Sequence, residues 1–111
     1  MVRKVSVGKP IPAGSSTVFY TVPDGYRASW TLLYAINHTS SAKALTVTWH
    51  DASANQDIDI FYNYPLSASN YVMFDSGAWV MLEEGDTVTI TGASGMDGDA
   101  IVSFELERNN A

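Results

Sequence analysis

Apolar and polar side chains alternate along nearly the whole chain, and this period of two constrains the fold more than any other feature. The longest run places apolar side chains at every second position: Tyr26, Ala28, Trp30, Leu32, Tyr34 and Ile36. Arg27, Ser29 and Thr31 occupy positions between them. Successive side chains of a β-strand point to opposite faces, so such a run is typical of a strand with one buried face. We predict that the apolar set faces a core.

Shorter runs repeat the alternation, and turn residues separate them. The expected strands cover residues 2–7, 17–22, 26–37, 45–50, 57–64, 71–74, 87–91 and 102–107. Between two of these runs, Pro23–Gly25 reads Pro-Asp-Gly, which is typical of a turn because proline fixes φ and glycine accepts a positive φ. No window carries a helical repeat with caps.

About eight short strands predict an all-β chain that folds as a single antiparallel β-sandwich over residues 1–111. This length suits one domain. We favour a jelly-roll-like arrangement, which divides eight strands between two sheets, over an immunoglobulin-like sandwich. Periodicity alone does not give the order of the strands within the sheets.

Several strands carry apolar side chains on both faces, in a chain with three Trp, six Tyr and four Phe. A second apolar face is covered either within the fold or by a neighbouring subunit. Because a small sandwich has only one interior, such strands favour an interface. We therefore predict a homo-oligomer. The candidates for self-association are Leu33, Phe61, Tyr71, Met73, Trp79 and Met81.

The net charge of −6 comes from 12 acidic and 6 basic side chains, which argues against a nucleic-acid partner. Arg3, Lys4 and Lys9 nevertheless gather near the N-terminus. They belong either to a solvated first strand or to a docking strand or arm, residues 1–9, that contacts an acidic partner surface. No stretch has the ~20 apolar residues of a membrane span, so we expect no membrane partner. The N-terminus does not resemble a signal peptide, and there is no cysteine for a disulfide.

The chemically active side chains are isolated from one another in the sequence. His38 and His50 are the two histidines, and neither has the spaced partners that a metal site needs. Asp57 and Asp59 share a strand face, where exposed charge is the ordinary interpretation. No serine is selected as a nucleophile by a neighbouring acid and base. We predict no catalytic residue, no metal site, no cofactor and no enzymatic activity.

Two weaker motifs concern carbohydrate. Asn37-His38-Thr39 fits the N-glycosylation pattern, but it is short and no secretion signal accompanies it. Residues 57–65 combine tyrosines with Asp and Asn, a composition that could form a sugar-binding platform. The same tyrosines fit core packing equally well.

Two blocks of the sequence resemble a known family. In residues 18–49 a "YTVPDG" turn opens a long strand that ends in Asn and Thr, and a Thr/Val strand follows. Residues 79–92, "WVMLEEGDTVTITG", contain a Gly-Asp turn before another Thr/Val strand. Both blocks resemble small β-sandwich virion proteins of tailed bacteriophages, most closely the head decoration, or cement, proteins. The chain departs from the pattern at Asp24, where alanine is usual, and in its aromatic middle.

The resemblance implies a virion structural protein that decorates the capsid exterior and is made in the host cytoplasm. Its partner would be the major capsid protein, whose lattice it would bind and stabilise, often as a homotrimer. The resemblance is also compatible with a tail or head-fibre adhesion module that binds host surface glycans. Under the first interpretation, Arg3, Lys4 and Lys9 are the candidates for capsid docking.

Overall fold

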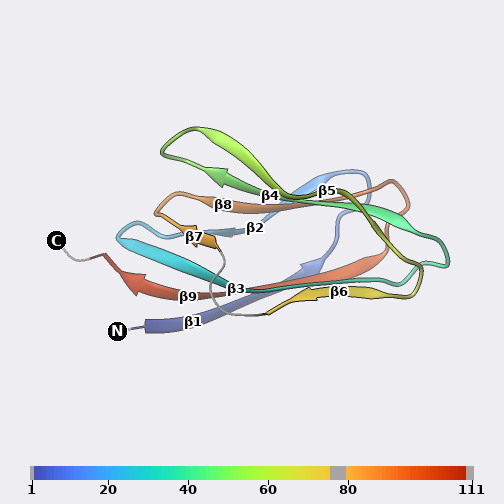
Figure 1. The fold of residues 1–111 in the computed structure, drawn as a ribbon, viewed down its shortest axis with the longest axis horizontal. Helices are drawn as coiled ribbons and strands as arrows, with labels where there is room; N and C mark the ends of the chain where they lie inside the picture. Colours follow the sequence, from blue (N-terminus) through green and yellow to red (C-terminus); the bar gives the residue numbers. More distant parts are fainter. Residues whose placement is uncertain (1, 76–79, 110–111) are drawn as a thin grey trace.

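Nine strands form in the part of the chain that the computed structural model describes, residues 2–75 and 80–109 (Figure 1). They are β1 (Val2–Pro10), β2 (Ser16–Thr21), β3 (Tyr26–Asn37), β4 (Lys43–Asp51), β5 (Gln56–Leu66), β6 (Tyr71–Phe74), β7 (Val80–Leu82), β8 (Thr87–Gly92) and β9 (Gly98–Arg108). All pairings between them are antiparallel. Each expected strand is present, and the predicted all-β fold is confirmed.

The strands form two sheets that pack as a sandwich, seen edge-on in Figure 1. Sheet I has the order β1-β9-β3-β6, and β7 also pairs with β3. Sheet II has the order β2-β8-β4-β5. The pairs are nested along the chain: β1 with β9, β2 with β8, β3 with β6 and β7, and β4 with β5. This nesting, divided between two sheets, is the jelly-roll arrangement. The jelly-roll prediction is therefore correct, and the ninth strand arises because the partner of β3 is split into β6 and β7.

A β-bulge in β3 corrects the predicted face of its second half. Trp30 pairs with Phe104 and Leu32 pairs with Ser103, so Thr31 is an extra residue in the ladder. An extra residue reverses the faces of everything after it. Before the bulge, Ala28 and Trp30 are buried as predicted. After it, the buried residues are Leu33, Ala35 and Asn37, whereas Leu32, Tyr34 and Ile36 face outward and are half-buried.

The core lies between the two sheets and centres on aromatic side chains. The rings of Trp30 and Phe104 are 5.8 Å apart, and Tyr20 stacks on Phe104 at 4.6 Å. Burial raises the pKa of the Tyr20 hydroxyl, although the nearby Arg3 charge acts in the opposite direction. The Trp30 indole donates a 2.9 Å hydrogen bond to the carbonyl of Leu32, which helps to satisfy the backbone at the bulge.

Asn37, at the end of β3, is one of two buried polar side chains among the described residues. Its amide nitrogen donates to the carbonyls of Ser41 and Leu66, at 2.9 and 3.0 Å. Its amide oxygen accepts from both the backbone nitrogen and the hydroxyl of Thr39. The side chain therefore joins the β3–β4 loop to the end of β5. The Asn-His-Thr motif is explained by this network, since the amide nitrogen is enclosed in the folded protein.

Asp86, just before β8, is the other buried polar side chain among those residues. Its carboxylate accepts hydrogen bonds from the Trp49 indole at 3.0 Å and from the backbone nitrogens of Ala52 and Glu83, both at 2.9 Å. One carboxylate thus fixes the β4–β5 turn, the β7–β8 turn and a partly buried tryptophan that packs against the core. A buried charge is tolerated when hydrogen bonds of this kind replace its water.

Candidate interaction surface

The outer face of sheet I carries an apolar patch on three adjacent strands. Tyr34 on β3 lies opposite Ile101 on β9 and Met73 on β6, and Ile36 lies opposite Tyr71. Directly opposed residues of an antiparallel pair share a face. We define the apolar patch as Leu32, Tyr34, Ile36, Tyr71, Met73 and Ile101. Tyr71, Met73 and Ile101 are 56%, 47% and 37% exposed.

Two aromatic rings of the apolar patch, one on β3 and one on β6, lie beside each other. The rings of Tyr34 and Tyr71 lie 5.7 Å apart. On the β1 side, Gly8 is the cross-strand neighbour of Ile101, and its missing side chain leaves Ile101 uncovered. No member of the patch is charged. At one end the patch is bordered by Asp99, which lies opposite Ile36 on β9 and whose carboxylate is 3.1 Å from the His38 ring.

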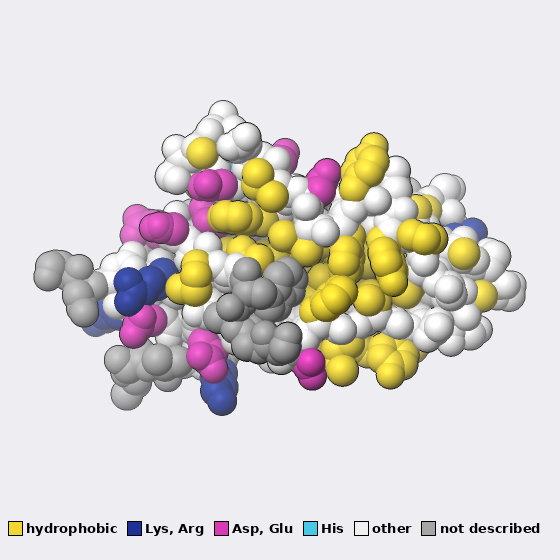
Figure 2. Space-filling view, viewed as in Figure 1, with side chains coloured by type: hydrophobic (Ala, Val, Ile, Leu, Met, Phe, Trp, Pro, Cys, Tyr) yellow, Lys and Arg dark blue, Asp and Glu magenta, His cyan; other side chains and the backbone are white. Residues whose placement is uncertain are grey.

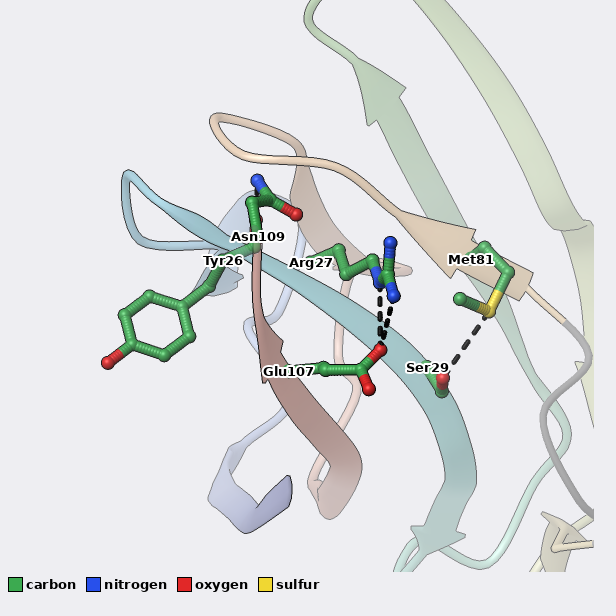
Figure 3. A network of polar contacts seen from close by, with 6 residues as sticks. All are labelled: Tyr26, Arg27, Ser29, Met81, Glu107 and Asn109. Atoms are coloured by element: carbon green, nitrogen blue, oxygen red, sulfur yellow. Dashed lines mark hydrogen bonds and ion pairs between the residues drawn. The ribbon is translucent and has the colours of Figure 1, made fainter. Parts of the chain in front are cut away.

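Charged side chains occupy the other half of this outer face, toward the chain termini (Figure 3). Arg27 donates to Glu107 through Nε at 2.9 Å, and its Nη2 makes a second contact with the same oxygen. This hydrogen bond and the guanidinium charge hold the pKa of Glu107 below its usual value. Ser29 donates a 3.3 Å hydrogen bond to the sulfur of Met81, which is 53% exposed.

The three predicted docking cations are exposed in β1, but they point in two directions. Arg3 and Lys9 lie on the inward side, in register with the buried Leu106 and Ala100 on β9. The Arg3 guanidinium lies 5.9 Å from the centroid of the Tyr26 ring. The Lys9 ammonium donates to the carbonyl of Val18 at 3.1 Å and lies 5.7 Å from the Phe19 ring. Lys4 points outward, in register with Glu105 on β9.

Residues 2–9 are an integral edge strand. Every residue of β1 has a partner in β9, from Val2 with Glu107 to Pro10 with Asp99. Val5 and Val7 pack against the core. The N-terminal segment is therefore part of sheet I and not a free arm, while its outer edge is open to a further strand.

The self-association candidates that the structure describes separate into three groups. Leu33 is fully buried in the core, so its prediction as an interface residue is wrong. Phe61 is half-buried, and its ring stacks on Tyr64 at 4.9 Å and lies 5.3 Å from Phe74, where it closes the side of the sandwich between β5 and β6. Tyr71, Met73 and Met81 are exposed on the outer face of sheet I. Trp79 lies outside the described residues.

Sequence reasoning missed four members of the apolar patch: Leu32, Tyr34, Ile36 and Ile101. The alternation of residues 26–36 assigned the first three to the core. The adjacent leucines 32 and 33 were the available signal, because two neighbouring apolar residues in a half-buried strand indicate either a two-sided strand or a bulge.

The two central strands of sheet II, β4 and β8, present polar side chains on its outer face. Thr46 and Thr48 on β4 lie beside Thr91 and Thr89 on β8. His50 contacts Asp57 at 2.7 Å, and the Thr48 hydroxyl donates to Asp59 at 3.0 Å. Across residues 2–75 and 80–109, no three His, Cys, Asp or Glu side chains are grouped as metal ligands. Nor does any helix in this part of the chain have the length and apolar character needed to cross a membrane.

Charge and apolar surface are also separated on the edge of the sandwich formed by β5, β6 and β7. Figure 2 shows acidic and basic side chains gathered mainly toward the end that carries both termini. Apolar side chains occupy the middle of this view. The molecule is 50 Å long and 18 Å thick, so its ends are well separated.

No protein-family model matches the chain, and no curated protein matches it in sequence. Solved structures do share its fold. A chain from Bacillus endospore appendages, which are disulfide-linked pili, has a TM-score of 0.54 at 16% identity, with 99% of this chain and 88% of that chain covered. The nucleoplasmin-like N-terminal domain of Drosophila FKBP39 has a TM-score of 0.54 at 8% identity, covering 97% and 94%.

A chain from infectious bursal disease virus, Gx strain, has a TM-score of 0.53 at 10% identity, covering 97% of this chain and 36% of the viral one. At such identities the likeness concerns the fold alone. One of these chains belongs to a pilus, one is a nucleoplasmin-like domain and one belongs to a virus, so the fold is compatible with several functions. The disulfide linkage of the pili is not available to a chain without cysteine.

Proposed function

We propose that this protein is a bacteriophage capsid decoration protein that binds the outer surface of the major capsid protein lattice and stabilises the head. The observation that carries the proposal is a jelly-roll sandwich whose buried polar groups, Asn37 and Asp86, serve the fold, which leaves broad sheet faces as its functional surfaces. Each of these residues lies in one of the two blocks that resemble cement proteins. The viral neighbour with the same fold adds support at the level of architecture.

In this proposal the protein is not an enzyme and uses no cofactor. It is made in the host cytoplasm, sits on the capsid exterior, and associates with itself, with a trimer favoured by the resemblance. Many modest contacts on one lattice would act together, because each bound subunit raises the effective concentration of its neighbours.

We propose β1 as the docking element. Its outer edge can accept a further strand, and Lys4 offers a charge on the outer face that the core does not use. Arg3 and Lys9 would contribute less, since Arg3 already contacts a ring of this chain and Lys9 contacts both a ring and a carbonyl.

The test is binding of the purified protein to empty capsids of its own phage. Hundreds of copies per virion and a higher capsid melting temperature are expected. Lys4→Glu should weaken binding, while Lys43→Glu, at the far end of the molecule, should not. A protein that ignores these capsids, or is present in a dozen copies or fewer, would not be a decoration protein.

A second candidate function is adhesion to host glycans, and one observation favours it. Tyr62 is 72% exposed on the outer side of β5. Its neighbour Asn63 has a positive φ of 49°, and the Asn63 side chain and backbone both contact the Thr46 hydroxyl. An exposed ring beside ordered polar groups can stack on a sugar and hydrogen-bond its hydroxyls.

A glycan array would test adhesion. Specific binding that Tyr62→Ala removes and Tyr71→Ala preserves would favour the adhesion function over decoration. An array without binding, combined with capsid binding, would eliminate it.

A further inference from the structure

We propose that the apolar patch on sheet I binds the same patch of a second copy, in a face-to-face pair related by a twofold axis. This inference does not depend on capsid decoration, and it would stand if that function failed.

The shape of the patch favours a second sheet as its occupant. The patch spans β9, β3 and β6, and opposed residues stand side by side across the three strands. Two sheets with the same right-handed twist pack face to face about 10 Å apart, with their strands within about 30° of each other. A second copy presents a sheet with that twist and a matching apolar surface.

The distribution of charge selects how the two copies lie. The six patch residues are uncharged, and Asp99, which lies opposite Ile36 at the border of the patch, already contacts the His38 ring at 3.1 Å. Pairing the patch with itself therefore buries little unpaired charge. Arg27, Glu107, Lys4 and Glu105 all lie on the other half of the face, toward the chain termini. A twofold axis that crosses the strands near Tyr34 superimposes the two apolar halves. It also points the two charged halves away from each other.

The size of the patch sets the strength of the pair. Six side chains on three strands cover a few hundred Å², less than the ~800 Å² that each partner contributes to a standard interface. We therefore expect a weak pair, with a Kd of roughly 0.1 mM. Such a contact matters where copies are crowded, as on a shared surface.

Analytical ultracentrifugation of the full chain over a range of concentrations tests the inference. The wild type should double its mass as concentration rises, whatever its starting oligomer. Met73→Glu should place like charges near the axis and raise the Kd at least tenfold. Ile101→Glu should do the same from β9. The matched control is Tyr62→Glu, which places the same charge at an exposed ring on the other sheet and should leave association unchanged.

Folding is checked separately, because Met73 and Ile101 are exposed and their variants should keep the wild-type thermal transition. If one variant fails to fold, Tyr71→Ser provides a third, uncharged change in the patch. Small-angle scattering should show a pair longer than the 50 Å of one molecule, since the copies overlap only at their apolar halves.

Several results would overturn the inference. They are a wild type that shows no doubling at millimolar concentration, association that survives all three patch variants, and association that Tyr62→Glu also removes. A patch variant that reduces the mass to one third would show a threefold contact instead of a pair.

Discussion

At the scale of single residues, two polar side chains show why short sequence motifs in this chain indicate its fold. Asn37 and Asp86 are buried, hydrogen-bonded, and placed where loops from different parts of the chain meet. A motif centred on such a residue identifies an architecture. It says little about the partner that the architecture binds, because a partner contacts the outer faces of the sheets and not these buried residues.

Removing the Asp86 carboxylate should be severely destabilising. Asp86→Ala leaves the Trp49 indole and the backbone nitrogens of Ala52 and Glu83 without their acceptor. Buried donors left unsatisfied cost about 1 to 3 kcal/mol, so a loss of about 3 kcal/mol in unfolding free energy is expected by urea denaturation. Asp24→Ala, in the exposed turn before β3, is the control and should change stability by less than about 0.5 kcal/mol. Equal effects would show that the network contributes nothing.

Gly98 is predicted to reject any side chain because of its contacts, whatever its own backbone angle. A Cβ there would lie 1.9 Å from the carbonyl oxygen of Ile36. At Gly8, also in a sheet I strand, the nearest atom would be Ile101 Cγ1 at 3.6 Å. Gly98→Ala should therefore lower the unfolding free energy by about 2 kcal/mol or more, and Gly8→Ala should leave it nearly unchanged. Similar melting temperatures for the two variants would contradict this.

The direction of the pKa shift of Glu107 determines how the Arg27–Glu107 pair affects stability at different pH values. The folded-state pKa of Glu107 is lowered, so the pair stabilises the fold above the unfolded-state pKa. That contribution is lost as the pH falls through the folded-state pKa. Because both groups are about half exposed, the effect should be small and sensitive to salt. Glu107→Gln should lower stability slightly at pH 7, and the difference should shrink as the pH falls through the folded-state pKa. A difference that grows in acid would refute the assignment.

At the scale of the elements, the bulge in β3 decides which residues form the core and which form the surface. Leu33→Ala removes a fully buried side chain and should cost about 2 to 5 kcal/mol of unfolding free energy. Leu32→Ala, one residue away on the outer face, should cost less than about 1 kcal/mol and should weaken self-association instead. Chemical denaturation and ultracentrifugation of the two variants separate these roles. The reverse result would place the bulge elsewhere.

The same element shows how far the sequence could predict the structure. Period-two alternation located the strands, because their polar positions face water. It failed after Thr31, because residues 32–36 are apolar on both faces of the strand. A one-residue shift there leaves an apolar residue at every position, so the pattern does not show which face is buried. The β3 residues of the apolar patch were therefore predicted to lie in the core, and Leu33 was predicted to lie on the surface. Tyr71 and Met73 are exposed, and their role in self-association remains a prediction.

At the scale of the whole molecule, the nested pairing makes the first strand depend on the last. β1 pairs with β9, and the two ends of the chain must meet before sheet I is complete. Such distant pairing is slow to form, because the entropy of closing a long loop is lost before the contacts are gained. The N-terminal strand is thus a structural requirement as well as a docking candidate.

Deleting residues 2–9 should therefore unfold the protein rather than only prevent docking. The deletion would expose the edge of β9 and uncover the core beside Val5 and Val7. It would also remove the contacts of Arg3 with the Tyr26 ring and of Lys9 with the Phe19 ring. We expect the cooperative thermal transition to disappear, whereas Lys4→Glu should keep it. If the truncated chain retained a wild-type transition, β1 would be dispensable for folding. The truncated chain would then test capsid docking directly. Any loss of capsid binding would be due to the missing strand and not to an unstable sandwich.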